Sequence, residues 1–200
     1  MPIYRRRLMA KDDIGESERA LVNSPWQTLS RELKYDNPWI RVEEYQVINP
    51  AGGAGIYGTV SFKNRAVAIV ALFENGDTLL VGQYRYPLQE YHWELPMGGA
   101  PEGESALECA QRELQEETGF RAARWQQILS MHLSNSITQE QGFTFIAEEL
   151  QAGEMALEET EDITCQRVPF ERVFQQVMAG EITDAMTVAS IMKVRLLGLA

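Results

Sequence analysis

The sequence predicts an α+β fold in which a mixed β-sheet is flanked by a few helices. Apolar or alternating stretches typical of strands recur along much of the chain, and a capped helical pattern covers roughly Ser105–Thr118. Two more helical patterns follow near the C-terminus. With 200 residues, of which 44% are hydrophobic, the chain is long enough for one domain with a full core and a small appendage.

Two strand patterns come first, Ile40–Ile48 and Ile56–Phe62, and the turn-rich residues between them favour an N-terminal β-hairpin. The residues that precede this hairpin are mixed and polar, with a short helical pattern near Glu16–Val22. We therefore divide the chain into an N-terminal extension that contains the hairpin, residues 1–62, and a main domain, residues 63–200.

The main domain is expected to begin with a second hairpin. Ala66–Phe73 is a continuous apolar run typical of a buried strand, and Asn75-Gly76 is a strong indicator of a tight turn before the next strand, Thr78–Gln83. We expect this pair to start the main sheet. The further strands are predicted at Glu90–Leu95, Trp125–Leu133, Gly142–Ala147 and Ile163–Val168.

The C-terminal part is predicted to contain an acidic connection and two helices. Seven acidic residues within Glu148–Asp162 indicate a solvated connection. Phe170–Met178 has helical spacing, and Thr183 or Asp184 is expected to cap a last helix that runs to Leu197.

A glycine-rich stretch leads directly into the first helix. Residues 98–103 contain three glycines and a proline, which we expect to form a loop that ends the preceding strand. Ser105 and Glu108 have the S-x-x-E spacing of a capping box, and Gly119 supplies a left-handed end. These features predict the limits of the helix.

One flank of this helix carries three carboxylates, Glu113, Glu116 and Glu117, at positions i, i+3 and i+4. Like charges at this spacing repel one another, and Arg112 offsets only part of the repulsion. Glu-rich helices are commonly solvated acidic faces, but hard divalent cations such as Mg²⁺ also prefer carboxylate oxygens. The spacing alone leaves both interpretations open.

The complete stretch resembles the catalytic box of the Nudix hydrolases. Each fixed position of that box is matched by Gly98-x5-Glu104-x7-Arg112-Glu113-Leu114-x-Glu116-Glu117-x-Gly119-Phe120. The resemblance implies the α/β/α layered Nudix fold and hydrolysis of a nucleoside diphosphate linked to another group. It also implies Mg²⁺ or Mn²⁺ as the cofactor.

The resemblance implies a role for each residue of the box. The metal ligands, which are also the catalytic glutamates, would be Glu113, Glu116 and Glu117, and the backbone carbonyl of Met97 would join them. Structural roles would fall on Gly98, where the backbone approaches closely, on Glu104 and Arg112, which brace the loop against the helix, and on Gly119.

Residues outside the box are expected to complete the site. Many family members take a water-orienting carboxylate from a later loop; Glu140 is the candidate here, with a solvated loop glutamate as the alternative. Gln83-Tyr-Arg85-Tyr-Pro87 and Trp93-Glu94-Leu95-Pro96 resemble the ADP-ribose and nucleoside-diphosphate-sugar pyrophosphatase branch. In that branch Arg85 would contact phosphate, and Glu94 would lie near the metals or the substrate.

The same resemblance bears on the N-terminal hairpin and on the substrate. In this branch the hairpin is commonly exchanged in a homodimer, and its aromatic residues stack on the base. Tyr57 is the candidate for that contact, and ordinary strand packing is the alternative. The segment His132–Thr138 lacks the proline that ADP-ribose hydrolases often carry there, which leaves other nucleoside-diphosphate sugars open as substrates.

The resemblance therefore favours a Mg²⁺-dependent enzyme that cuts ADP-ribose or a nucleotide sugar into a nucleoside monophosphate and a sugar phosphate. One alternative is a house-cleaning nucleoside triphosphate pyrophosphohydrolase. Another is a non-catalytic nucleotide-sensing Nudix domain, which is disfavoured because such domains usually lose box glutamates and this chain retains them.

The composition narrows the partners and the location. A net charge of −11 disfavours non-specific binding to nucleic acid or anionic membranes. The two cysteines, Cys109 and Cys165, do not form a disulfide or zinc motif, and no apolar run approaches a membrane span. We expect a cytoplasmic homodimer, joined through the N-terminal hairpin, whose other partner is a small nucleoside-diphosphate substrate.

Overall fold

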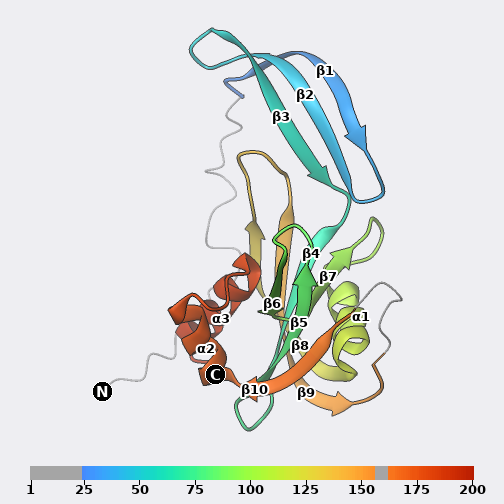
Figure 1. Cartoon of the computed structure of the whole chain (residues 1–200), viewed down its shortest axis with the longest axis vertical. Helices are drawn as coiled ribbons and strands as arrows, with labels where there is room; N and C mark the ends of the chain where they lie inside the picture. Colours follow the sequence, from blue (N-terminus) through green and yellow to red (C-terminus); the bar gives the residue numbers. More distant parts are fainter. Residues whose placement is uncertain (1–23, 156–161) are drawn as a thin grey trace. The chain divides into compact units, whose positions relative to one another are not determined.

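The computed structural model describes residues 24–155 and 162–200, which form an α+β arrangement of strands with flanking helices (Figure 1). The helix predicted near Glu16–Val22 lies outside the described residues. None of the described helices is long and apolar enough to cross a membrane.

The contacts within the chain divide it into two units. One unit consists of the described residues up to Glu32 together with Glu44–Tyr57, and the other consists of Leu33–Glu43 together with Gly58–Ala200. The second unit contains the two main sheets and the helices described below. The predicted boundary between residues 62 and 63 stays a prediction.

The N-terminal strands form a three-stranded sheet in the order β1-β2-β3. The two predicted strands are confirmed as β2 (Ile40–Ile48) and β3 (Ala54–Phe62), which are neighbours in the sheet as the predicted hairpin requires, and β1 (Gln27–Asp36) adds a third strand that was not predicted. β1 is exposed along its whole length. Apolar and polar residues partly alternate along β1, as in a strand, but the strand was not predicted because most of its side chains are polar.

The larger main sheet has four strands in the order β7-β4-β9-β8, and only its β4-β9 pair is parallel. Its strands are β4 (Arg65–Ala71), β7 (Met97–Ala100), β8 (Phe120–His132) and β9 (Gln141–Ala152). β9 is longer than predicted and ends at Ala152. The prediction of a solvated connection is therefore wrong for residues 148–152, which belong to the strand. Pairing with β8 continues to Ala152 and holds the acidic segment in the sheet.

The smaller main sheet is antiparallel and has the order β10-β5-β6. Its strands are β5 (Asp77–Arg85), β6 (Glu90–Glu94) and β10 (Thr164–Pro169). The predicted turn exists, since the Gly76 amide donates to the Phe73 carbonyl at 2.9 Å. The predicted hairpin is nevertheless wrong, because β4 and β5 enter different sheets, and each finds its partners elsewhere in the chain.

The predicted loop at residues 98–103 is also partly wrong. Gly98 and Gly99 belong to β7 and pair with Val67 and Ala66 of β4. Glycine weakens a strand, but it is suited to one that another group approaches closely. Such a group lies against Gly98, as described below.

The helix predicted after the glycines is confirmed as α1 (Ala106–Thr118). Ser105 is its N-cap, and both hydrogen bonds of the predicted capping box to Glu108 are present. Gly119 ends the helix with a left-handed φ of 73°. Helix α2 spans Phe170–Ala179, and α3 spans Ala185–Leu197 with Asp184 as its cap.

Figure 1 places α1 on one side of the main sheets and α2 and α3 on the other. Strand β4 is buried on both faces: Val67 and Ile69 pack in the cluster that contains residues of α1, whereas Val70 packs in the cluster that contains residues of α2 and α3. The α/β/α layering predicted from the resemblance is therefore confirmed. The β7-α1 connection brings the glycine strand and the acidic helix together at one edge.

Candidate active site

A single guanidinium organises the acidic flank of α1. Arg112 Nε lies 3.0 Å from Glu104 Oε1, and its Nη1 lies 2.7 Å from Glu113 Oε1 and 2.9 Å from Glu116 Oε2. These carboxylates raise the pKa of Arg112, with the Glu104 hydrogen bond as the largest cause. In return, Arg112 lowers the pKa of Glu104. Arg112 therefore holds three carboxylates close together.

Gly98 is required by the position of Glu113. A Cβ at Gly98 would lie 1.9 Å from Glu113 Oε1, which is far inside any permitted contact. The carboxylate therefore occupies the space that a side chain would fill, directly against the backbone of β7. This close approach gives a physical reason for glycine at the first position of the box.

The third glutamate of the flank is anchored to the strand. The Met97 amide donates a hydrogen bond of 2.9 Å to Glu117 Oε2. Glu117 is only 1% exposed and Glu113 only 6%, so two carboxylates are buried at the β7-α1 junction. Burial of ionised carboxylates is costly unless cations or hydrogen bonds compensate for the lost water.

The donor set at this junction fits a hard divalent cation. Carboxylate and carbonyl oxygens are the ligands that Mg²⁺ and Mn²⁺ prefer. In residues 24–155 and 162–200, no three acidic, histidine or cysteine side chains converge as a finished metal site. Arg112 forms ion pairs with Glu113 and Glu116, so a bound cation would take over part of the charge neutralisation that Arg112 gives these carboxylates.

The cluster opens onto a hollow with an empty volume of about 830 Å³, which we call the α1 pocket. Its walls include Gly98, Glu104, Arg112, Glu113 and Glu116, together with Asn64 and Pro101. Asn64 was not singled out by the sequence, because it immediately precedes β4 and no motif includes it. Its amide Nδ2 would lie 2.8 Å from a Cβ on Gly99, so it packs against the glycine strand.

Glu140 lies at the same end of the four-stranded sheet as the glycine strand. Gly98 pairs with Val67, and Val67 pairs with Phe143, three residues after Glu140. Two interstrand spacings therefore separate β7 from β9, about 10 Å. Burial raises the pKa of the half-buried Glu140 carboxyl. This position is compatible with the predicted role in activating water, which stays a prediction.

Arg85 and Glu94 contact each other in a smaller pocket. Arg85 Nη2 lies 2.6 Å from Glu94 Oε1, and the pocket is also lined by His92, Thr183 and Asp184. Neither Arg85 nor Glu94 lines the α1 pocket. The predicted contacts of this pair with substrate therefore stay predictions.

The Glu94→Gln variant is expected to change how stability depends on pH. Burial raises the pKa of Glu94 above its ordinary 4.5, although Arg85 opposes the shift. Because the native state binds this proton more tightly, the stabilisation is complete below the unfolded pKa and disappears as pH rises through the raised pKa. Thermal unfolding from about pH 4 to 8 should show natural protein losing stability relative to Glu94→Gln. If the plots of Tm against pH were parallel for the two proteins, this expectation would be contradicted.

Tyr57 packs against another aromatic residue of its own unit. Its ring lies edge-on to Trp26, with centroids 5.3 Å apart and an interplanar angle of 85°. The contact agrees with the alternative of strand packing. The predicted stacking of Tyr57 on a base stays a prediction.

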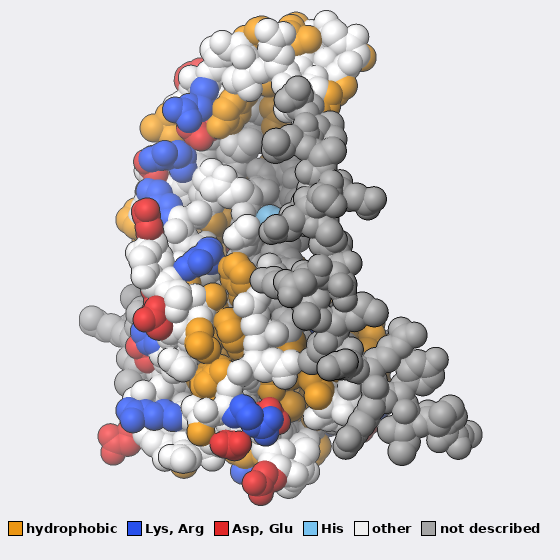
Figure 2. Space-filling model, turned by 180° about the vertical axis from the view of Figure 1, so that it is seen from behind, with side chains coloured by type: hydrophobic (Ala, Val, Ile, Leu, Met, Phe, Trp, Pro, Cys, Tyr) orange, Lys and Arg blue, Asp and Glu red, His pale blue; other side chains and the backbone are white. Residues whose placement is uncertain are grey.

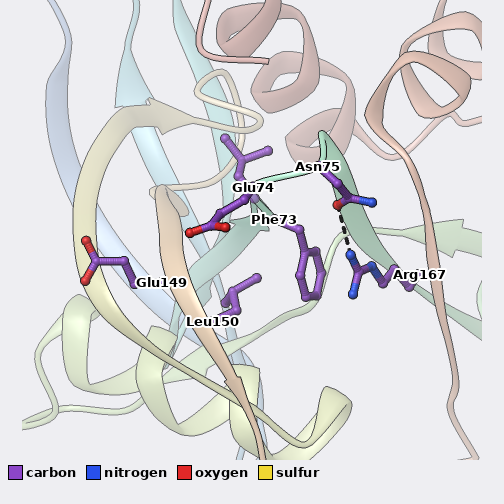
Figure 3. A pocket seen from close by; sticks show the side chains of 7 residues that line it. Phe73, Glu74, Asn75, Glu149, Leu150 and Arg167 are labelled. Carbon is purple, nitrogen blue, oxygen red and sulfur yellow. Dashed lines mark hydrogen bonds between the residues drawn. The ribbon is translucent and has the colours of Figure 1, made fainter.

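A second hollow, shown in Figure 3, lies beyond the end of β4 and shares no wall with the α1 pocket. Arg167 lies 3.7 Å from the centroid of the Phe73 ring and donates to Asn75 at 2.9 Å. Glu149 is paired with Arg124 at 3.2 Å. These contacts hold the turn before β5 and the end of β9 in place, and we interpret this hollow as structural.

Comparisons with known proteins agree with this geometry. The NUDIX domain family matches residues 62–187, and the nucleoside diphosphate sugar hydrolase N-terminal domain matches residues 26–60. An ADP-ribose pyrophosphatase of Mycobacterium tuberculosis is 30% identical over 84% of this chain and 83% of its own length. One from Bacillus subtilis is 34% identical over 66% of this chain and 72% of its own length.

A solved structure supports the fold independently. The crystal structure of an ADP compounds hydrolase superimposes with a TM-score of 0.77 at 22% identity, and the match covers 85% of this chain and 92% of that one.

Proposed function

Because the chain belongs to the Nudix hydrolase family, we propose that its α1 pocket cleaves the diphosphate of ADP-ribose or of a nucleotide sugar. The products are a nucleoside monophosphate and a sugar phosphate. The observation that carries this proposal is the contact of Glu113 with Gly98, near Glu117, which is hydrogen-bonded to Met97, because these contacts concentrate hard oxygen donors at the β7-α1 junction.

The reaction is a hydrolysis that needs no other reactant. The oxygen of water bonds to one phosphorus, the bond from that phosphorus to the bridging oxygen breaks, and the bridging oxygen leaves with the other phosphate. A bound divalent cation supplies charge neutralisation for the diphosphate. Glu113, Glu116 and Glu117 would hold this cation, and Glu140 takes a proton from the attacking water.

We also propose that the N-terminal sheet forms a homodimer. Exposed apolar side chains gather along it: Leu29 is 56% exposed, Tyr35 54% and Ile56 66%. Such side chains are normally covered when they form an extended patch, and β1, at the edge of this sheet, is exposed along its whole length. A cytoplasmic location stays a prediction.

The charge distribution suits a small polar substrate rather than a polymer. On the face shown in Figure 2, basic and acidic side chains lie intermingled. The chain as a whole carries a net charge of −11, so an anionic substrate has to be attracted locally, by cations bound at the glutamates or by individual basic side chains.

Product identification tests the proposed reaction. Purified protein with Mg²⁺ or Mn²⁺ should convert ADP-ribose or a nucleotide sugar to a nucleoside monophosphate and a sugar phosphate. Release of pyrophosphate from nucleoside triphosphates, with no turnover of sugar derivatives, would instead identify a triphosphate pyrophosphohydrolase. Tight binding of ADP-ribose without hydrolysis would identify a nucleotide-sensing domain.

A further inference from the structure

A third hollow adjoins the α1 pocket and has no role in the reaction described above. Its empty volume is about 1000 Å³, and it shares two wall residues with the α1 pocket, Asn64 and Pro101. We call it the loop pocket, because its other walls include Lys63 and Gln139, from the turn before β4 and the loop before β9.

The loop that carries Gln139 is held in place against β3. The Val60 amide donates to the Ile137 carbonyl at 2.9 Å, and Val60 forms a parallel bridge with Thr138. Ser61 Oγ donates to Gln139 Oε1 at 3.2 Å. Because its oxygen is occupied by Ser61, Gln139 retains its amide nitrogen as a donor for a ligand.

Two basic side chains, Arg41 and Lys63, line the same hollow. Lys63 Nζ lies 2.6 Å from Asp36 Oδ1, and Arg41 Nη2 lies 3.2 Å from Asp36 Oδ2. Lys63 also donates to the Asn37 carbonyl. One carboxylate therefore orients two basic side chains, which lowers the entropy lost when either of them binds a ligand.

The loop pocket combines donors and acceptors in the way that a sugar requires. Donors come from Lys63 and the Gln139 amide, an acceptor comes from the Glu102 carboxylate, and the Asn64 amide offers both. A sugar presents several hydroxyl groups, each of which both donates and accepts. A nucleobase instead requires an aromatic face, and Phe62 alone among the pocket's nine lining residues is aromatic.

We propose that the loop pocket binds the sugar of the sugar-phosphate half of the substrate, with Asn64 between that sugar and the diphosphate. The inference rests on the proposed function, in which the diphosphate lies in the α1 pocket beside the cation that Glu113 and Glu116 would hold. Asn64 forms a wall of both hollows, so a group attached to one phosphate passes this side chain when it enters the loop pocket.

Kinetics with paired substrates test this assignment. The Gln139→Ala variant should raise KM for ADP-ribose about fivefold, the loss expected for one hydrogen bond, with kcat within about twofold of the natural value. KM for the methyl ester of ADP, which has the diphosphate but no sugar beyond it, should stay unchanged. Lys63→Ala should behave in the same way. Equal changes for both substrates, or no change for either, would overturn the proposal.

A matched control and a binding measurement complete the test. Gln166→Ala removes the same group from an exposed position on β10 and should leave both KM values unchanged. Saturation-transfer NMR with ribose 5-phosphate, in the presence of Mg²⁺, should detect binding to natural protein and much weaker binding to Gln139→Ala. If neither substrate is hydrolysed, the proposed function fails. The NMR result then still tests whether the loop pocket binds the sugar. Equal binding by natural protein and Gln139→Ala, or no binding by either, would overturn the assignment of this pocket.

Discussion

The Glu116→Gln variant is expected to hydrolyse its substrate about a thousandfold more slowly than the natural enzyme, a loss of about 4 kcal/mol of transition-state stabilisation. The change removes one negative charge from the acidic flank and keeps the shape of the side chain. Glu116 contacts Arg112 at 2.9 Å, and its side chain is 26% exposed, so the packing of α1 is preserved. The loss should therefore fall on kcat.

Two measurements separate this effect from unfolding. Steady-state kinetics with ADP-ribose should give the lower kcat, while thermal unfolding without metal should give a Tm close to that of the natural protein. Addition of Mn²⁺ should raise the Tm of natural protein, because ligand binding stabilises the native state, and should raise that of Glu116→Gln much less.

The matched control for this variant is Glu181→Gln, which makes the same change at an exposed position after α2. It should retain natural activity and the natural response to Mn²⁺. If Glu116→Gln kept more than about a tenth of the natural kcat, a direct role of Glu116 in holding the cation would be contradicted.

The fold was predictable where its determinants are local in sequence. Helix α1 has its cap at Ser105, its stop at Gly119 and its apolar positions within fifteen residues, so all of its signals lie inside the segment. The pairing of strands was not predictable in the same way. The turn at Gly76 forms as expected, yet β4 pairs with β7 and β9, whose residues lie far along the chain.

The candidate site, too, was predictable only where its residues lie close together in the sequence. The glutamates of α1 and their glycine lie within one motif, so their resemblance to the Nudix box was readable in the sequence. The loop pocket was not predictable, because Lys63, Asn64 and Gln139 come from two separate segments that the parallel pairing of β4 with β9 and the bridge between Val60 and Thr138 bring together. A single substitution in the glycine strand tests whether the motif itself works through the contact that the structure places there.

The Gly98→Ala variant is expected to lower activity at least about a hundredfold and to destabilise the protein by about 1–3 kcal/mol. Gly98 has no positive φ, so alanine is permitted by the backbone, and the cost is steric. The new Cβ would lie 1.9 Å from Glu113 Oε1, so either the carboxylate or β7 has to move. Both movements separate Glu113 from the position at which it meets the diphosphate and its cation.

Gly99→Ala is the matched control for stability, because it makes the same change in the next residue of β7. Its Cβ would lie 2.8 Å from Asn64 Nδ2 and 3.1 Å from Asn64 Cβ, a smaller overlap than the 1.9 Å approach to Glu113 at Gly98. Chemical denaturation should therefore show a smaller loss for Gly99→Ala than for Gly98→Ala. Equal losses would mean that the strand tolerates no side chain at either position, and that the contact with Glu113 is not what requires glycine at the start of the box.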